Sequence, residues 1–102
     1  MASACDGPRR PRVWHVKDPR CPPGAVLIDR QTPWGNQHRI GDPDENGERM
    51  SRITVIRRFE LDLIADPELL MRGISALRGR HLRCHCAPEP CHGDIWLRLV
   101  NS

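Results

Sequence analysis

The stretch LRCHCAPEPCHGDIWLRLV, residues 82–100, decides the fold of this chain. It predicts the end of a strand over residues 80–86, a turn at Ala-Pro-Glu-Pro, and a helix that begins near Cys91. Three of the five cysteines and two of the five histidines lie within it, between Cys84 and His92. A strand, a turn and a helix start therefore place several reactive side chains close together.

The residues before this stretch predict a small α/β domain. Apolar and β-branched segments at residues 12–16 and 25–30 are typical of strands, and residues 31–48 hold too many breakers for a regular element. A helix is predicted over residues 49–65, and a second helix begins after Asp66, a good N-cap. The expected order is strand, strand, long loop, helix, helix, strand, helix. This order predicts a sheet of three or four strands covered by about three helices.

The composition indicates one α/β domain, residues 12–102, behind an N-terminal tail, residues 1–11, that is predicted to be disordered. No apolar run reaches the roughly 20 residues of a membrane span, and the N-terminus lacks the apolar core of a signal peptide. We therefore expect a cytoplasmic protein with reduced thiols. The net charge of +3 comes without a basic block, which does not favour nucleic-acid binding. The oligomeric state stays open.

A zinc site is the first interpretation of the cysteines and histidines. Two thiolates on tetrahedral zinc must approach to about 3.8 Å. If Cys84 and Cys86 lie on one extended strand, their Cα atoms are about 6.6 Å apart, which argues against a shared metal ion. A bent strand end would leave Cys86, Cys91 and His92 as the metal ligands. Cys84 is instead expected in the hydrophobic core.

The start of the final helix suggests a second interpretation, an anion or nucleotide pocket. Free backbone N–H groups and the positive end of the helix dipole gather near Cys91, where they lower a thiol pKa and attract an anion. Gly93 would let a ligand approach the backbone, and Cys86 and Pro88 would line the turn. Such a pocket would lie outside the carboxyl end of a strand, where open α/β sheets commonly bind ligands.

Two kinds of chemistry are open to the same residues. If the pocket is catalytic, Cys91 or Asp94 would act as nucleophile or base, and His92 would assist. A redox pair of Cys86 and Cys91 is a further interpretation, although their spacing is not the Cys-x-x-Cys of thiol oxidoreductases.

Trp34, Gly35 and Asn36 form a second motif, inside the long loop. An aromatic ring beside an amide offers a nucleobase both a stacking surface and hydrogen-bonding groups. The plainer interpretation is that the Trp ring anchors the loop to the core. We expect these three residues to bind the ligand together with the turn.

Together, the two motifs resemble one family, the domains of unknown function numbered 4326, which are widespread in tailed phages and some bacteria. Members typically show a Trp-Gly-Asn-Pro loop, a Leu-Arg-Gly helix end and a C-terminal Cys-x-Cys-Ala-Pro-x-x-Cys-His-Gly-Asp motif. The resemblance runs from about Pro11 to the C-terminus, and Gln37 departs from it where the family has Pro. It implies a phage origin and brings no activity with it. The matching residues are Trp34, Gly35, Asn36, Gly41, Leu77, Arg78, Gly79, Cys84, Cys86, Ala87, Pro88, Cys91, His92, Gly93 and Asp94.

The leading prediction is a phage-encoded domain of the host cytoplasm that binds a nucleotide-like or other small anionic ligand. The ligand would lie between residues 34–36 and residues 86–94, to be sequestered or acted on, without a resident cofactor. The alternative is a zinc-stabilised module that binds a host protein. Neither a membrane nor a nucleic acid is an expected partner.

Overall fold

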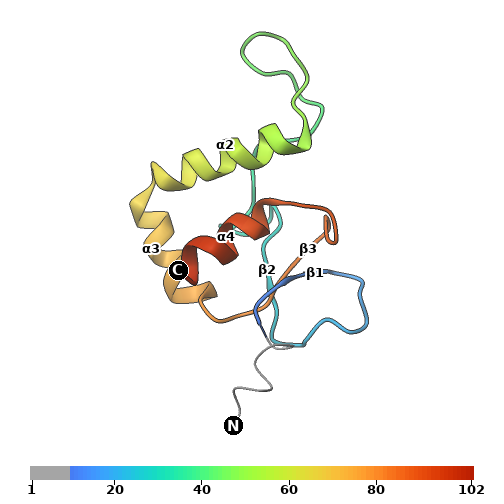
Figure 1. The fold of residues 1–102 in the computed structure, drawn as a ribbon, viewed down its shortest axis with the longest axis vertical. Helices are drawn as coiled ribbons and strands as arrows, with labels where there is room; N and C mark the ends of the chain where they lie inside the picture. Colours follow the sequence, from blue (N-terminus) through green and yellow to red (C-terminus); the bar gives the residue numbers. More distant parts are fainter. Residues whose placement is uncertain (1–9) are drawn as a thin grey trace.

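The structure, a computed structural model, describes residues 10–102, so nearly all of the predicted tail lies outside the described residues. The α/β class and the predicted element order are confirmed (Figure 1). Within the described residues, no helix is both long and apolar enough to span a membrane. The elements are β1 (Val13–His15), β2 (Val26–Leu27), α2 (Arg52–Ile64), α3 (Pro67–Leu77), β3 (Leu82–Cys84) and α4 (His92–Val100).

The sheet has three parallel strands in the order β1-β3-β2, so the last strand in sequence is the central one. Leu82 pairs with Val13 on one side and with Val26 on the other. Because all three strands run the same way, their carboxyl ends meet at one edge, at His15, Leu27 and Cys84. Loops that leave this edge are the usual ligand-binding segments of parallel sheets.

Helices α2 and α3 each begin at an N-cap residue whose side chain accepts a backbone hydrogen bond. The Ser51 hydroxyl accepts a hydrogen bond from the Thr54 backbone N–H and starts α2. The Asp66 carboxylate accepts from the Leu69 N–H at 3.1 Å, and Pro67 occupies the first turn of α3. Each cap satisfies a backbone donor that has no partner inside its helix.

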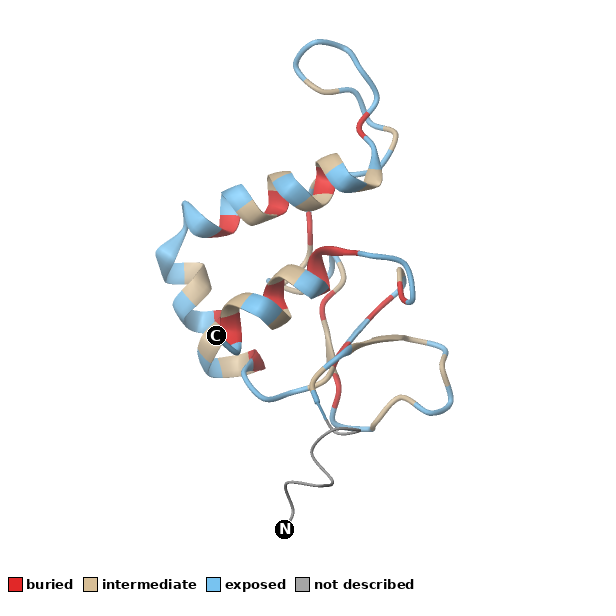
Figure 2. Ribbon diagram, viewed as in Figure 1, coloured by how far each residue is buried: buried red, intermediate tan, exposed pale blue. Residues whose placement is uncertain are grey.

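The core lies where α4 contacts β3 and the other two helices (Figure 1). Trp96, on α4, is fully buried, and its indole Nε1–H donates to the Trp34 carbonyl oxygen at 2.9 Å. Figure 2 shows buried residues at intervals along α2 and α4, separated by exposed ones. This is the pattern of helices with one face on a shared core. The other fully buried side chains are Ile28, Leu63, Leu77, Leu82 and Val100.

The long connection between β2 and α2 has no helix or strand, as predicted. One isolated bridge between Pro43 and Arg49 closes a turn that projects beyond α2 (Figure 1). The first part of the connection, residues 28–40, runs back across the carboxyl edge of the sheet and contributes to the cavity described next.

Candidate functional site

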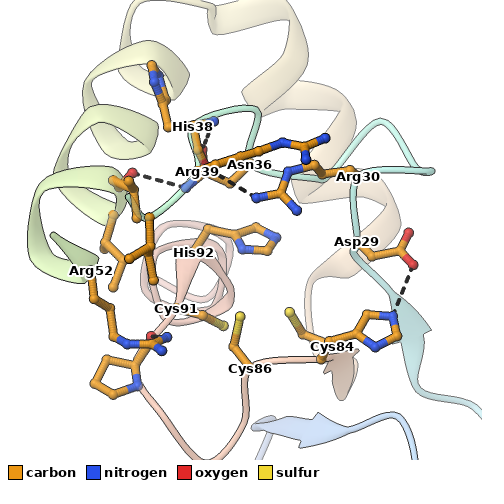
Figure 3. A pocket seen from close by; sticks show the side chains of 15 residues that line it. Asp29, Arg30, Asn36, His38, Arg39, Arg52, Cys84, Cys86, Cys91 and His92 are labelled. Carbon is orange, nitrogen blue, oxygen red and sulfur yellow. Dashed lines mark hydrogen bonds and ion pairs between the residues drawn. The ribbon is translucent and has the colours of Figure 1, made fainter. Parts of the chain in front are cut away.

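A cavity of about 310 Å³ opens at the carboxyl edge of the sheet (Figure 3). Its walls come from three segments that are distant in sequence: the long connection after β2, the first turns of α2, and the segment from β3 to α4. The lining residues are Asp29, Arg30, Asn36, His38, Arg39, Ile40, Arg52, Val55, Ile56, Cys84, His85, Cys86, Pro90, Cys91 and His92.

Three cysteine thiols meet in one wall of this cavity. The Sγ atoms of Cys84, Cys86 and Cys91 all lie within 4.8 Å of one another (Figure 3). Within residues 10–102, this is the one group of three or more His, Cys, Asp or Glu side chains close enough to share a metal ion. Cys84 and Cys91 are buried and Cys86 is half-buried, so the cluster is largely shielded from water.

The cluster forms because the strand ends sooner than the sequence indicated. The predicted strand over residues 80–86 was too long: β3 stops at Cys84, and the chain bends at His85 and Cys86. A turn in which the Glu89 N–H donates to the Cys86 carbonyl at 2.9 Å then carries the chain back to α4. The argument against a metal shared by Cys84 and Cys86 required an extended strand, so it does not apply. Cys84 belongs both to the core and to the thiol cluster.

The three thiols differ in acidity because they interact with one another. A hydrogen bond with the Cys91 thiol lowers the pKa of Cys84 to about 5, and the Cys86 backbone N–H also favours its thiolate. The same hydrogen bond, together with burial, raises the pKa of Cys91. Burial, followed by the negative charge of Cys84, raises the pKa of Cys86. The Gly93 N–H at the helix start lowers the pKa of Cys91 as expected, but the larger effects of Cys84 and of burial leave this pKa raised. Without a metal, these interactions favour the thiolate of Cys84 over those of Cys86 and Cys91.

Cys91 is also the N-cap of α4. Its Sγ accepts a hydrogen bond from the Gly93 N–H at 3.3 Å, and the Asp94 carboxylate accepts one from the Cys91 N–H at 3.0 Å. This reciprocal arrangement is a capping box, which satisfies two free donors at the helix start. The Asp94 carboxylate is thus engaged with the backbone, and Asp94 does not line the cavity.

His92 is buried at the floor of the cavity, and its ring is held on both sides. Its Nε2 lies 2.7 Å from the Ile28 carbonyl oxygen, and its face packs against Phe59 with ring centroids 5.1 Å apart. A carbonyl oxygen can only accept, so Nε2 carries the proton and is not free to bind a metal. Of the expected metal ligands, Cys86 and Cys91 are thus in the cluster, and Cys84 takes the place expected for His92.

The Trp-Gly-Asn motif holds the loop in place. The Trp34 ring packs edge to face on Trp96, 5.6 Å away, and does not line the cavity. Asn36 does line it, but its Nδ2 donates to the Val55 carbonyl and its Oδ1 accepts from the His38 N–H. Any Cβ at Gly35 would lie 2.4 Å from the Asp29 carbonyl oxygen, so only glycine fits. The motif thus joins the loop to α4 and α2.

The remaining expected ligand residues have packing roles or lie outside the cavity. A Cβ at Gly93 would lie 2.7 Å from Val13 Cγ2 and 2.9 Å from Ile28 Cδ1, so this glycine lets α4 approach the sheet. Pro88 is exposed, follows a cis peptide bond and does not line the cavity.

Three arginines at the cavity were not among the expected site residues. Arg30 and Arg39 come from the long connection, and Arg52 comes from the first turn of α2 (Figure 3). The Arg52 Nη1 donates to the Pro90 carbonyl at 3.0 Å, which holds this guanidinium beside the thiol cluster. None of the three forms an ion pair with a carboxylate of the described residues. Their spacing in the sequence gives no signal, because only the folded loop brings them together.

The comparisons with known proteins agree with the resemblance noted in the sequence. Residues 12–102 match the family described as "Domain of unknown function (DUF4326)". The chain belongs to this family. It is also 37% identical over 76 residues to the "Uncharacterized 12.4 kDa protein in nrdA-td intergenic region" of Enterobacteria phage T4, covering 74% of this chain and 67% of the relative. The expected relation to phage proteins is thus confirmed. No solved structure matches the chain.

Each residue type of the C-terminal Cys-x-Cys-Ala-Pro-x-x-Cys-His-Gly-Asp stretch of this chain has a distinct place in the structure. Its three cysteines are the thiol cluster, its His joins α4 to β2, its Gly fits against the sheet and its Asp caps α4. Five of its positions, those of Cys84, Cys91, His92, Gly93 and Asp94, are thus explained by packing and capping alone or in part. The convergence of three sulfur atoms at a cavity is the one feature that packing does not require.

Proposed function

We propose that this domain binds one Zn²⁺ ion through the thiolates of Cys84, Cys86 and Cys91. The observation that carries the proposal is the approach of all three Sγ atoms to within 4.8 Å of one another. Thiolates on tetrahedral zinc lie about 3.8 Å apart, so small side-chain movements close the site. Soft sulfur ligands select zinc or copper(I) over magnesium or calcium.

The environment of the cluster supports metal binding. Metal binding requires that all three thiols lose their protons, and the charged Arg52 guanidinium beside Cys86 favours its thiolate. The Gly93 N–H that donates to Cys91 Sγ is a typical outer-shell interaction of a zinc-bound cysteine. Three protein ligands leave a fourth zinc position for water or a substrate.

The nucleotide-like ligand expected from the sequence has less support than the metal. Among the described residues, no Trp or Phe lines the cavity, so its walls lack the stacking surface that Trp34 was expected to provide. The described residues include exposed apolar side chains on α2, at Ile53, Leu61 and Ile64, but these identify no particular host-protein partner.

The test is the metal content and affinity of the purified full chain, handled under reducing conditions because neighbouring thiols oxidise easily. We expect one zinc per chain by elemental analysis, and on Co²⁺ substitution the absorption bands of tetrahedral cobalt–thiolate coordination. Cys86→Ser should weaken Zn²⁺ binding at least about 100-fold, since it removes one of three ligands. Cys21→Ser is the matched control, because Cys21 lies outside the cluster, and it should leave the affinity unchanged. Substoichiometric metal, or equal affinity in both variants, would contradict the proposal.

A further inference from the structure

We infer that the fourth metal position takes the carboxylate of a small apolar monocarboxylate held in the cavity. This inference rests on the proposed metal site. All three sulfur atoms line the cavity, and no other ligand side chain of residues 10–102 joins the cluster. A zinc ion held there would thus have its remaining coordination position open to the cavity.

The charges around the cavity select an anion. Arg30, Arg39 and Arg52 contribute three positive charges to the lining, and Asp29 contributes one negative charge. His38 is paired at 2.6 Å with Asp62, which lies outside the cavity. A zinc ion with three thiolates adds a net charge of −1, so the occupied site, with its lining histidines counted as neutral, carries about +1. One further negative charge neutralises it, and a phosphate dianion would overcharge it.

The geometry of the lining suits a carboxylate head. Arg52 lies on the metal side, where it contacts both the Pro90 carbonyl and the Cys86 thiol. Arg39 makes no side-chain hydrogen bond within the described residues and is free to pair with a ligand. A guanidinium and a carboxylate form parallel, charge-assisted hydrogen bonds of high specificity. One carboxylate oxygen would bind the metal, and the other would accept from a guanidinium.

One part of the wall is apolar. Ile40, Val55, Ile56 and Pro90 face the cavity, which at about 310 Å³ is at the small end of ligand pockets. Apolar walls favour an apolar body on the ligand, because each CH₂ group that leaves water strengthens binding about fourfold. The ligand class is thus a short aliphatic carboxylate.

The experiment titrates the Co²⁺-loaded full chain and follows the visible absorption of the metal. We expect butanoate and hexanoate to change the cobalt spectrum, hexanoate at a lower concentration than butanoate, and butanoate at a lower concentration than inorganic phosphate. The uncharged 1-butanol should have no effect. Arg39→Gln and Arg52→Gln should each weaken butanoate binding about tenfold. Arg72→Gln, the same change at an exposed α3 position outside the cavity, should not.

The outcomes distinguish a failure of the metal site from a failure of the carboxylate ligand. No stoichiometric binding of Co²⁺ would overturn the metal site itself, and this inference with it. Three results would overturn the carboxylate ligand but not the metal site. They are a cobalt spectrum that does not change on addition of carboxylates, tighter binding of phosphate than of butanoate, and an equal loss of butanoate affinity in Arg39→Gln and Arg72→Gln. Cys5 lies outside the described residues, so the Cys5→Ser variant tests whether Cys5 is the fourth metal ligand. A weaker cobalt affinity in this variant would mean that the fourth position belongs to the protein, which also overturns the inference.

Discussion

The Nε2 atom of His92 lies 2.7 Å from the carbonyl oxygen of Ile28, across 64 positions of sequence. The ring thereby joins the first turn of α4 to the residue that follows β2. It also fixes the position of Cys91, which precedes His92 in the sequence and belongs to the thiol cluster. His92 thus holds the site in position and is not one of the proposed metal ligands.

We predict that His92→Ala destabilises the fold and leaves the metal stoichiometry unchanged. The substitution leaves the Ile28 carbonyl unpaired and empties space beside Phe59, at a cost of about 2–4 kcal/mol. Urea unfolding, with zinc counted separately, measures both effects. His85→Ala, at a side chain that is 63% exposed, is the control and should cost little. Loss of one zinc per chain in a folded His92→Ala protein would show that His92 is a metal ligand.

Trp34→Ala tests whether the Trp-Gly-Asn motif supports the fold or binds the ligand. Because the ring is half-buried against Trp96, we expect a loss of about 2–3 kcal/mol of unfolding free energy. Ligand binding by the protein that remains folded should be unchanged. Gln37→Ala, an exposed neighbour, should leave both unchanged. A Trp34→Ala protein of normal stability that has lost nucleotide binding would instead support a stacking role.

Gly73→Ala should destabilise the packing of α3 against α4. A Cβ at this position would lie 2.2 Å from Cζ3 of Trp96, whose ring is fully buried and cannot move aside. We expect a net loss of about 1–3 kcal/mol, although alanine favours helices more than glycine does. Ser75→Ala, on the exposed side of the same helix, should change stability by about 0.5 kcal/mol or less. Equal thermal midpoints for the two variants would contradict the close contact.

The stability of the metal-free protein should depend on pH through the thiol cluster. The folded pKa of Cys84, about 5, lies below its ordinary value of 9.0. Between these values the unfolded chain binds a proton that the folded chain lacks, so stability rises with pH from about 5 to 9. Cys86 and Cys91 have raised pKa values, so stability should fall above pH 9. Urea unfolding across this range checks both slopes. Cys84→Ser should flatten the rise, and a rise that is unchanged in this variant would contradict the role of its thiolate.

Local signals were enough to predict the element order. Ser51 and Asp66 start α2 and α3 because short side chains reach their own helix ends, and this depends on a few neighbouring residues only. Local signals were not enough to predict the thiol cluster, because its formation depends on where β3 ends. The sequence is compatible with a β-strand as far as Cys86. The bend after Cys84, which brings the third sulfur atom to the cluster, has no local signal in the sequence.

The arginines of the cavity were beyond sequence reasoning for a different reason. Arg30, Arg39 and Arg52 meet only because the long connection folds back over the sheet edge, where the Trp34 backbone carbonyl and the Asn36 side chain hold it. Trp34 and Asn36 were singled out correctly as unusual. Their use as structural supports could not be told from a binding role, because both roles need an aromatic ring and an amide at fixed positions.

The position of β3 at the centre of the sheet has a consequence for synthesis of the protein. β1 and β2 have no contact as strands until Leu82–Cys84 lies between them. A nascent chain that still holds these residues in the ribosome can form α2 and α3 but no sheet, because α4 follows β3 in the sequence. The sheet of this domain therefore forms only after Cys84 has left the ribosome, and the pairing of strands about 70 and 55 residues apart makes that step slow for so small a domain.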